Sequence, residues 1–125
     1  MKKILFLDDD PMRHMKFRDT MARNEWDVDV RYVWGVVDAI AAMKKERFDL
    51  ACFDHDLSVE DQMCDPDGTT REPNGTYLAQ RMIEELTITM PTKVLVHSYN
   101  APGARSMIAI LETAGVEVHW KPFAL

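Results

Sequence analysis

The chain is poor in cysteine, with only two among its 125 residues. Cys52 stands in an apolar run and Cys64 in a polar stretch, and together they match neither a metal-binding motif nor a disulfide framework. No apolar run approaches the roughly 20 residues of a transmembrane helix, and no secretory leader is visible. These absences predict a cytoplasmic protein without a membrane span.

Positive charge is also scarce, because 15 Lys and Arg residues stand against 21 Asp and Glu residues. The net charge of -6 excludes broad electrostatic binding to a nucleic-acid backbone, although a small nucleotide held by a local cation remains compatible with it. The length is sufficient for one domain with a single core, and residues 1–125 are predicted to form that domain.

Strand and helix patterns alternate along the chain. Short apolar or alternating runs predict strands, and apolar residues at helical spacing predict helices. We expect strands at 4–7, 28–33, 48–53, 93–96 and 116–120, and helices at 11–22, 36–46, 77–86 and 101–114. Such alternation predicts right-handed crossovers and a doubly wound α/β fold, with helices on both faces of a five-stranded parallel sheet.

The first strand ends at three consecutive acids, Asp8, Asp9 and Asp10, followed by Pro11. Their mutual repulsion is more than folding alone explains, and carboxylate oxygens are the ligands that Mg²⁺ prefers. The alternative is a helix cap, since an aspartate before a proline suits the start of a helix.

Other strands also end on polar residues. Open parallel sheets bind ligands at the carboxyl ends of their strands, so these residues are expected to share one crevice. They are Asp8 and Asp9 after the first strand, Asp54, His55 and Asp56 after the third, His97 and Ser98 after the fourth, and Lys121 after the fifth.

In this order the motifs resemble the receiver domain of two-component response regulators, a five-stranded flavodoxin-like fold, from Ile4 to Phe123. The resemblance rests on Leu7-Asp8-Asp9-Asp10, on Asp49-Leu50 through Asp54, on Ser98 and on Lys121-Pro122-Phe123. It implies that Asp8 and Asp9 hold Mg²⁺ and that Asp54 accepts a phosphoryl group. It further implies that Ser98 binds a phosphoryl oxygen and that Lys121 pairs with the phosphate or with Asp54.

The chain departs from that family in two segments. The sequence stops directly after Lys121-Pro122-Phe123, so we expect the last receiver helix to be missing and a partner protein or a second copy to cover the bare sheet face. The segment at about 58–75 is long for a loop of a compact domain and is expected to act as a lid, with Arg71 meeting a substrate phosphate.

Histidines are the third departure. His55 and His97 would supply a proton donor or acceptor near neutral pH or an extra ligand for a transition metal, and Asp56 adds a carboxylate to the metal site. Because side chains alternate along a strand, His97 is equally compatible with a buried neutral histidine. His14 and His119 are expected to be peripheral.

Asp54-His55-Asp56-Leu57 and His97-Ser98, followed by Asn100, are similar to a divergent receiver-like group that processes cyclic phosphates. Three functions stay open. The first is a metal-dependent phosphoesterase that acts on a cyclic phosphate of a nucleotide or RNA end, with Mg²⁺ or Mn²⁺ on Asp8, Asp9, Asp54 and Asp56. In it, His55 or His97 is the acid or base, and Ser98, Lys121 and Arg71 bind the phosphate. The second is a stand-alone receiver phosphorylated on Asp54, and the third is a non-catalytic module that sequesters a nucleotide or a partner.

Overall fold

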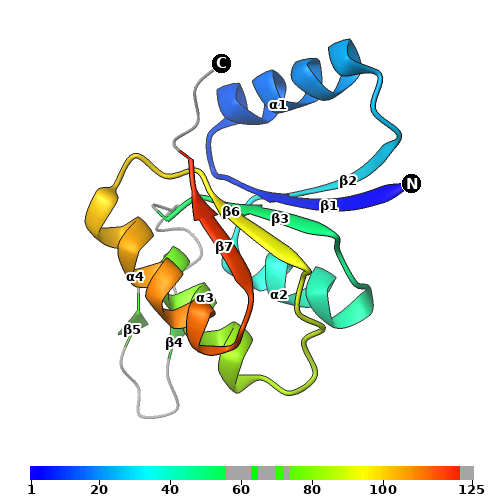
Figure 1. The fold of residues 1–125 in the computed structure, drawn as a ribbon. Helices are drawn as coiled ribbons and strands as arrows, with labels where there is room; N and C mark the ends of the chain where they lie inside the picture. Colours follow the sequence, from blue (N-terminus) through cyan, green and yellow to red (C-terminus); the bar gives the residue numbers. More distant parts are fainter. Residues whose placement is uncertain (56–62, 65–69, 72–73, 122–125) are drawn as a thin grey trace.

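A five-stranded parallel sheet forms the centre of the molecule (Figure 1). The computed structural model describes residues 1–55, 63–64, 70–71 and 74–121. The strands are β1 (Lys2–Leu7), β2 (Val28–Val33), β3 (Leu50–Phe53), β6 (Lys93–Val96) and β7 (Glu117–Trp120), in the order β2-β1-β3-β6-β7. This is the doubly wound parallel architecture that the alternating pattern predicts, and it has the flavodoxin-like form that the resemblance to receivers implies, so the fold prediction is confirmed.

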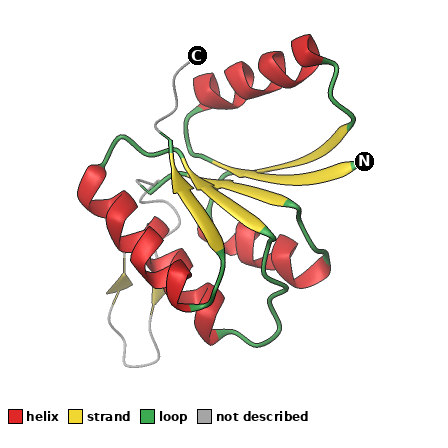
Figure 2. Ribbon diagram, in the orientation of Figure 1, coloured by secondary structure: helices red, strands yellow, loops and turns green. Residues whose placement is uncertain are grey.

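Helices cover both faces of the sheet (Figure 2). In the described part of the chain they are α1 (Pro11–Asn24), α2 (Val36–Lys45), α3 (Gly75–Glu84) and α4 (Ala101–Thr113). Of these four helices, α1 lies on one face and the other three lie on the opposite face. The alternation of side chains along β1 matches this division, because Ile4 and Phe6 pack on the α1 side while Leu5 and Leu7 pack against the other helices.

Polar caps set the starts of the helices that follow the strand ends. Asp10 caps α1 by accepting the amide of Met12, with Pro11 at the first helical position, as the capping interpretation predicts for Asp10. Asn74 caps α3, which therefore begins at Gly75, two residues before the predicted start.

Within the long segment at 58–75, the described residues form a short antiparallel pair, in which β4 (Met63–Cys64) pairs with β5 (Thr70–Arg71). The lid role and the phosphate contact of Arg71 stay predictions. The predicted metal ligand Asp56 lies outside the described residues, as does the segment after Lys121 where the last helix is expected to be missing.

A broad cleft of about 890 Å³ lies on the α1 side of the sheet. Ile4, Leu50 and Leu95 form its floor, and these side chains belong to the same apolar cluster as Phe6. Two exposed tryptophans, Trp26 and Trp120, lie at its edges. The expectation that a partner chain covers this face stays a prediction. None of the described helices is long and apolar enough to cross a membrane.

Candidate metal centre

Three carboxylates converge at the carboxyl ends of two neighbouring strands. In the parallel pairing of β1 with β3, Leu7 lies opposite Phe53, so the residues that follow, Asp8 and Asp54, emerge side by side. With Asp9 they place one oxygen each within 4.8 Å of the others. Asp8 and Asp54 are buried and Asp9 is half-buried, so the cluster opens to solvent on the Asp9 side.

Among the described residues, the cationic side chain that forms ion pairs with this cluster is Arg13, in the first turn of α1. Its guanidinium forms a bidentate pair with Asp8, with Nε 2.6 Å from Oδ2 and Nη2 2.9 Å from Oδ1. The same Nη2 lies 3.3 Å from Asp54 Oδ2 and 3.8 Å from Asp9 Oδ1, while Nη1 lies 3.2 Å from Asp10 Oδ2. One guanidinium therefore contacts four carboxylates.

Sequence reasoning missed Arg13, although a signal was present. Arg13 follows Asp10 by three residues and Asp9 by four, which are the spacings at which side chains meet on a helix surface. The pair with Asp8, five residues away, forms because Asp8 lies before the helix at the end of β1.

The three acids of the cluster titrate differently. Burial alone would raise the pKa of Asp8, but hydrogen bonds from His97, Arg13 and the Asp10 amide outweigh it and lower this pKa to about 2. Burial and the charge of Asp8 raise the pKa of Asp54 to about 6. The same two causes raise the pKa of Asp9. One arginine thus leaves the cluster with unbalanced negative charge.

Two histidines form hydrogen bonds with Asp8, one with its side chain and one with its backbone. His97, which is buried, has Nε2 2.9 Å from Asp8 Oδ2. His14 has Nε2 2.7 Å from the backbone carbonyl oxygen of Asp8, and its ring stacks on Trp34 with centroids 3.7 Å apart. The expectation that His14 is peripheral is wrong, because this side chain is buried in the wall of the site. Burial lowers the pKa of His14.

The side chain of His55 turns to the amino ends of α3 and α4. Its Nε2 lies 3.0 Å from Thr76 Oγ1, and its Nδ1 lies 3.3 Å from Asn100 Nδ2. Since an amide nitrogen only donates, Nδ1 accepts, and Nε2 carries the proton that is donated to Thr76. The backbone of His55 joins Asp54 to the start of α3, because its amide donates to Asp54 Oδ1 and its carbonyl accepts from the Gly75 amide.

Ser98 and Lys121, two further predicted phosphate ligands, make backbone hydrogen bonds in the structure. Ser98 is buried, and its Oγ accepts the backbone amide of Asn100 at 3.0 Å. Lys121 is exposed, its backbone amide donates to the carbonyl of Val96 at 2.8 Å, and it lines the cleft on the sheet face. Among the described residues Lys121 makes no ion pair with Asp54, and the cation on Asp54 is Arg13. His119 is exposed, and its Nε2 lies 3.5 Å from Glu117 Oε1.

Comparison with known families identifies this arrangement. The model of the cyclic-phosphate processing receiver domain matches residues 3–113. The chain belongs to this family. No curated protein sequence matches the chain.

Solved receiver structures share the fold of this receiver domain. The phosphorylated cyanobacterial phytochrome response regulator RcpA superposes with a TM-score of 0.69 at 16% identity, over 98% of this chain and 81% of that one. The Mn²⁺-bound response regulator Rcp1 gives 0.68 at 14% identity, over 99% and 82%. The receiver domain of a Pseudomonas aeruginosa sensor histidine kinase, with a magnesium ion in its active-site cleft, gives 0.64 at 16% identity, over 98% and 87%.

The donor set of this receiver fits a hard divalent cation. Asp8, Asp9 and Asp54 offer only carboxylate oxygens, they lie within reach of one ion, and their charge exceeds that of the single arginine beside them. His97 orients Asp8 in the way that hydrogen-bonded partners orient metal ligands. The chemistry of the residues therefore allows a metal ion at this position.

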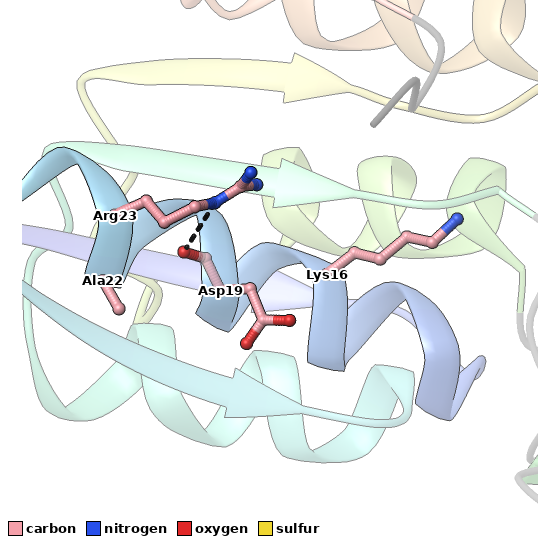
Figure 3. Close-up of a pocket in the computed structure, with 4 residues that line it drawn as sticks. All are labelled: Lys16, Asp19, Ala22 and Arg23. Atoms are coloured by element: carbon pink, nitrogen blue, oxygen red, sulfur yellow. Dashed lines mark hydrogen bonds between the residues drawn. The ribbon is translucent and has the colours of Figure 1, made fainter.

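A second hollow of the receiver lies elsewhere, on the outer surface of α1 (Figure 3). Its walls are Lys16, Asp19, Ala22 and Arg23, all from this one helix. Arg23 Nε lies 3.4 Å from the backbone oxygen of Asp19, so the arginine rests on its own helix. This hollow includes none of the acids of the metal centre.

Proposed function

We propose that this receiver domain binds Mg²⁺ or Mn²⁺ through Asp8, Asp9 and Asp54 and uses it to process a cyclic phosphate of a nucleotide or RNA end. The observation that carries the proposal is the convergence of three carboxylate oxygens within 4.8 Å at the edge of the sheet. The family to which the chain belongs is described as cyclic-phosphate processing, and receivers of the same fold hold Mn²⁺ or Mg²⁺.

In this reaction the ring of a 2′,3′-cyclic phosphate opens by hydrolysis. The oxygen of water joins phosphorus, one ring P–O bond breaks, and the released sugar oxygen takes a proton. A bound divalent cation would polarise the phosphate and acidify water. His97 and Arg13 hydrogen-bond to Asp8 and keep it ionised in the neutral pH range, so its carboxylate is ready to bind the cation.

The residues around the acids support two further roles. His97 donates to Asp8 and is buried, which suits a positioning residue that orients a metal ligand. His55 links the Asp54 loop to the amino ends of α3 and α4, so it keeps Asp54 in place. Acid or base catalysis by either histidine, and phosphate binding by Ser98, Lys121 or Arg71, stay predictions.

The test is hydrolysis of a 2′,3′-cyclic nucleotide with Mg²⁺ or Mn²⁺, followed by chromatography of the nucleoside monophosphate. We expect metal-dependent turnover that chelation abolishes, and that Asp9→Asn lowers by at least about a hundredfold because the ion loses a ligand. Asp29→Asn removes the same charge from an exposed site on β2 and should retain activity. Turnover that survives chelation would refute the proposal.

A second candidate function is that of a phospho-acceptor receiver modified on Asp54. Asp54 lies at the end of β3 beside Asp8 and Asp9, and the neighbour RcpA is a phosphorylated response regulator of the same fold. Incubation with Mg²⁺ and acetyl phosphate distinguishes the two: a stable mass increase of one phosphoryl group, lost in Asp54→Asn, supports this candidate. Tight nucleotide binding without turnover or labelling would instead favour a sequestering module.

A further inference from the structure

The contacts of Arg13 make it a direct rival of a metal ion. A single nitrogen, Nη2, lies 2.9 Å from an oxygen of Asp8, 3.3 Å from one of Asp54 and 3.8 Å from one of Asp9. These are the three residues whose oxygens lie close enough to hold one ion. The positive end of Arg13 therefore contacts the same carboxylates that a cation would bind.

Both cations cannot use these oxygens at once. A Mg²⁺ ion requires its oxygens at about 2.0–2.1 Å in near-octahedral geometry. A guanidinium nitrogen that kept its present contacts would lie within a few ångströms of that ion, where two positive charges repel strongly in a buried setting. Binding of the ion thus requires Arg13 to leave at least Asp8 and Asp54.

Arg13 is able to move without leaving the site. Its side chain is 27% exposed, and Nη1 already contacts Asp10, whose own side chain is more exposed than that of Asp8. A rotation that keeps the Asp10 contact would turn the guanidinium to the open, Asp9 side of the cluster. There it would be free to bind a phosphate in the bidentate geometry that it now uses on Asp8.

We propose that Arg13 is an internal counter-ion that competes with the divalent cation for Asp8, Asp9 and Asp54, and that its displaced guanidinium binds the phosphate that accompanies the cation. This rests on the proposed function, because it assumes the cation site. Arg13 thus pairs with the carboxylates in the metal-free protein and with the phosphate once the cation is bound. It also couples the ligands, since phosphate captures the arginine that the cation displaces and each ligand therefore strengthens the binding of the other.

The test is titration of the protein with MgCl₂ by isothermal calorimetry, with and without inorganic phosphate. Without phosphate, Arg13→Gln should bind Mg²⁺ about tenfold or more tightly than the wild type, because the ion no longer breaks charge-assisted hydrogen bonds. Phosphate should raise the Mg²⁺ affinity of the wild type severalfold and leave that of Arg13→Gln unchanged.

Two further variants separate charge from geometry. Arg23→Gln removes the same charge from the outer surface of the same helix, and it should bind Mg²⁺ like the wild type (Figure 3). Arg13→Lys keeps the charge without the planar fork. It should bind Mg²⁺ with intermediate affinity and lose most of the phosphate coupling, and it serves as the test if Arg13→Gln does not fold by circular dichroism.

The outcomes distinguish this inference from the function on which it rests. If Mg²⁺ binds to the wild type and Arg13→Gln with equal affinity, or if phosphate strengthens Mg²⁺ binding equally in both, Arg13 is not a competitor and the inference is overturned alone. If none of the four proteins binds Mg²⁺ or Mn²⁺, the proposed cation site itself is overturned together with it.

Discussion

The buried carboxylate of Asp54 predicts that the metal-free protein gains stability when this charge is removed. Burial and the charge of Asp8 raise the pKa of Asp54 from 3.8 to about 6. Between these values the folded state binds more protons than the unfolded state, so the free energy of unfolding falls as the pH rises from 3.8 to 6. Well above pH 6, Asp54 is ionised in both the folded and the unfolded state, and the cost of burying its charge lowers the free energy of unfolding to the full extent.

The size of this effect follows from the pKa shift. The rise of the Asp54 pKa from 3.8 to about 6 lowers the free energy of unfolding by about 3 kcal/mol at pH 7.5. At pH 4.5, where Asp54 is protonated in most of the folded protein, it lowers the free energy of unfolding by about 1 kcal/mol. In Asp54→Asn the amide nitrogen meets Arg13 where a carboxylate oxygen now accepts, which costs about 1 kcal/mol. The net stabilisation is then about 2 kcal/mol at pH 7.5 and near zero at pH 4.5.

Urea unfolding at both pH values, in the presence of chelator, measures this difference. The control is Asp29→Asn, which removes an exposed charge on β2 and should change the free energy of unfolding by less than about 0.5 kcal/mol at either pH. A destabilised Asp54→Asn at pH 7.5, or a gain of equal size at both pH values, would refute the reasoning, because a raised pKa requires the gain to vanish in acid.

Three further predictions concern the cation and the helix ends. Mg²⁺ at about 100 times its dissociation constant should raise the free energy of unfolding of the wild type by about 2.7 kcal/mol, and Asp9→Asn should lose most of this gain in thermal melts with and without the ion. Gly103→Ala should cost about 1–3 kcal/mol, because a Cβ there would lie 2.5 Å from the His55 ring, and adding His55→Ala should recover part of the loss in a double-mutant cycle. Asn100→Ala should cost about 1 kcal/mol or more in urea unfolding, because α4 loses its cap and His55 loses a hydrogen bond; an unchanged midpoint would contradict both roles.

Glycines at the starts of α3 and α4 show how closely the Asp54 loop approaches these helices. A Cβ at Gly75 would lie 2.8 Å from the Cα of His55, and one at Gly103 would enter its ring. Small residues are therefore required at both positions for His55 to reach Thr76 and Asn100. The sequence shows these glycines, but the contact that requires them joins segments far apart in the chain.

The amino-acid pattern was enough to predict the succession of strands and helices and the edge of the sheet at which the acids gather. Apolar runs and helical spacing are local signals, and strands that run parallel in one sheet have their carboxyl ends at the same edge. The pattern of residues was therefore sufficient to place Asp8, Asp9 and Asp54 at one edge, whereas the structure showed that Asp10 caps α1.

The side chains that contact those acids could be identified only once the chain was folded. Arg13, rather than Lys121, contacts Asp54, because α1 begins directly above the strand ends while the side chain of Lys121 is exposed at the end of β7. His97 bonds to Asp8 and His55 turns away to the helix ends, a choice set by the packing around each ring and not by its neighbours in sequence. Long or ring side chains at a strand end can reach several partners, so their direction depends on elements that the local pattern does not describe.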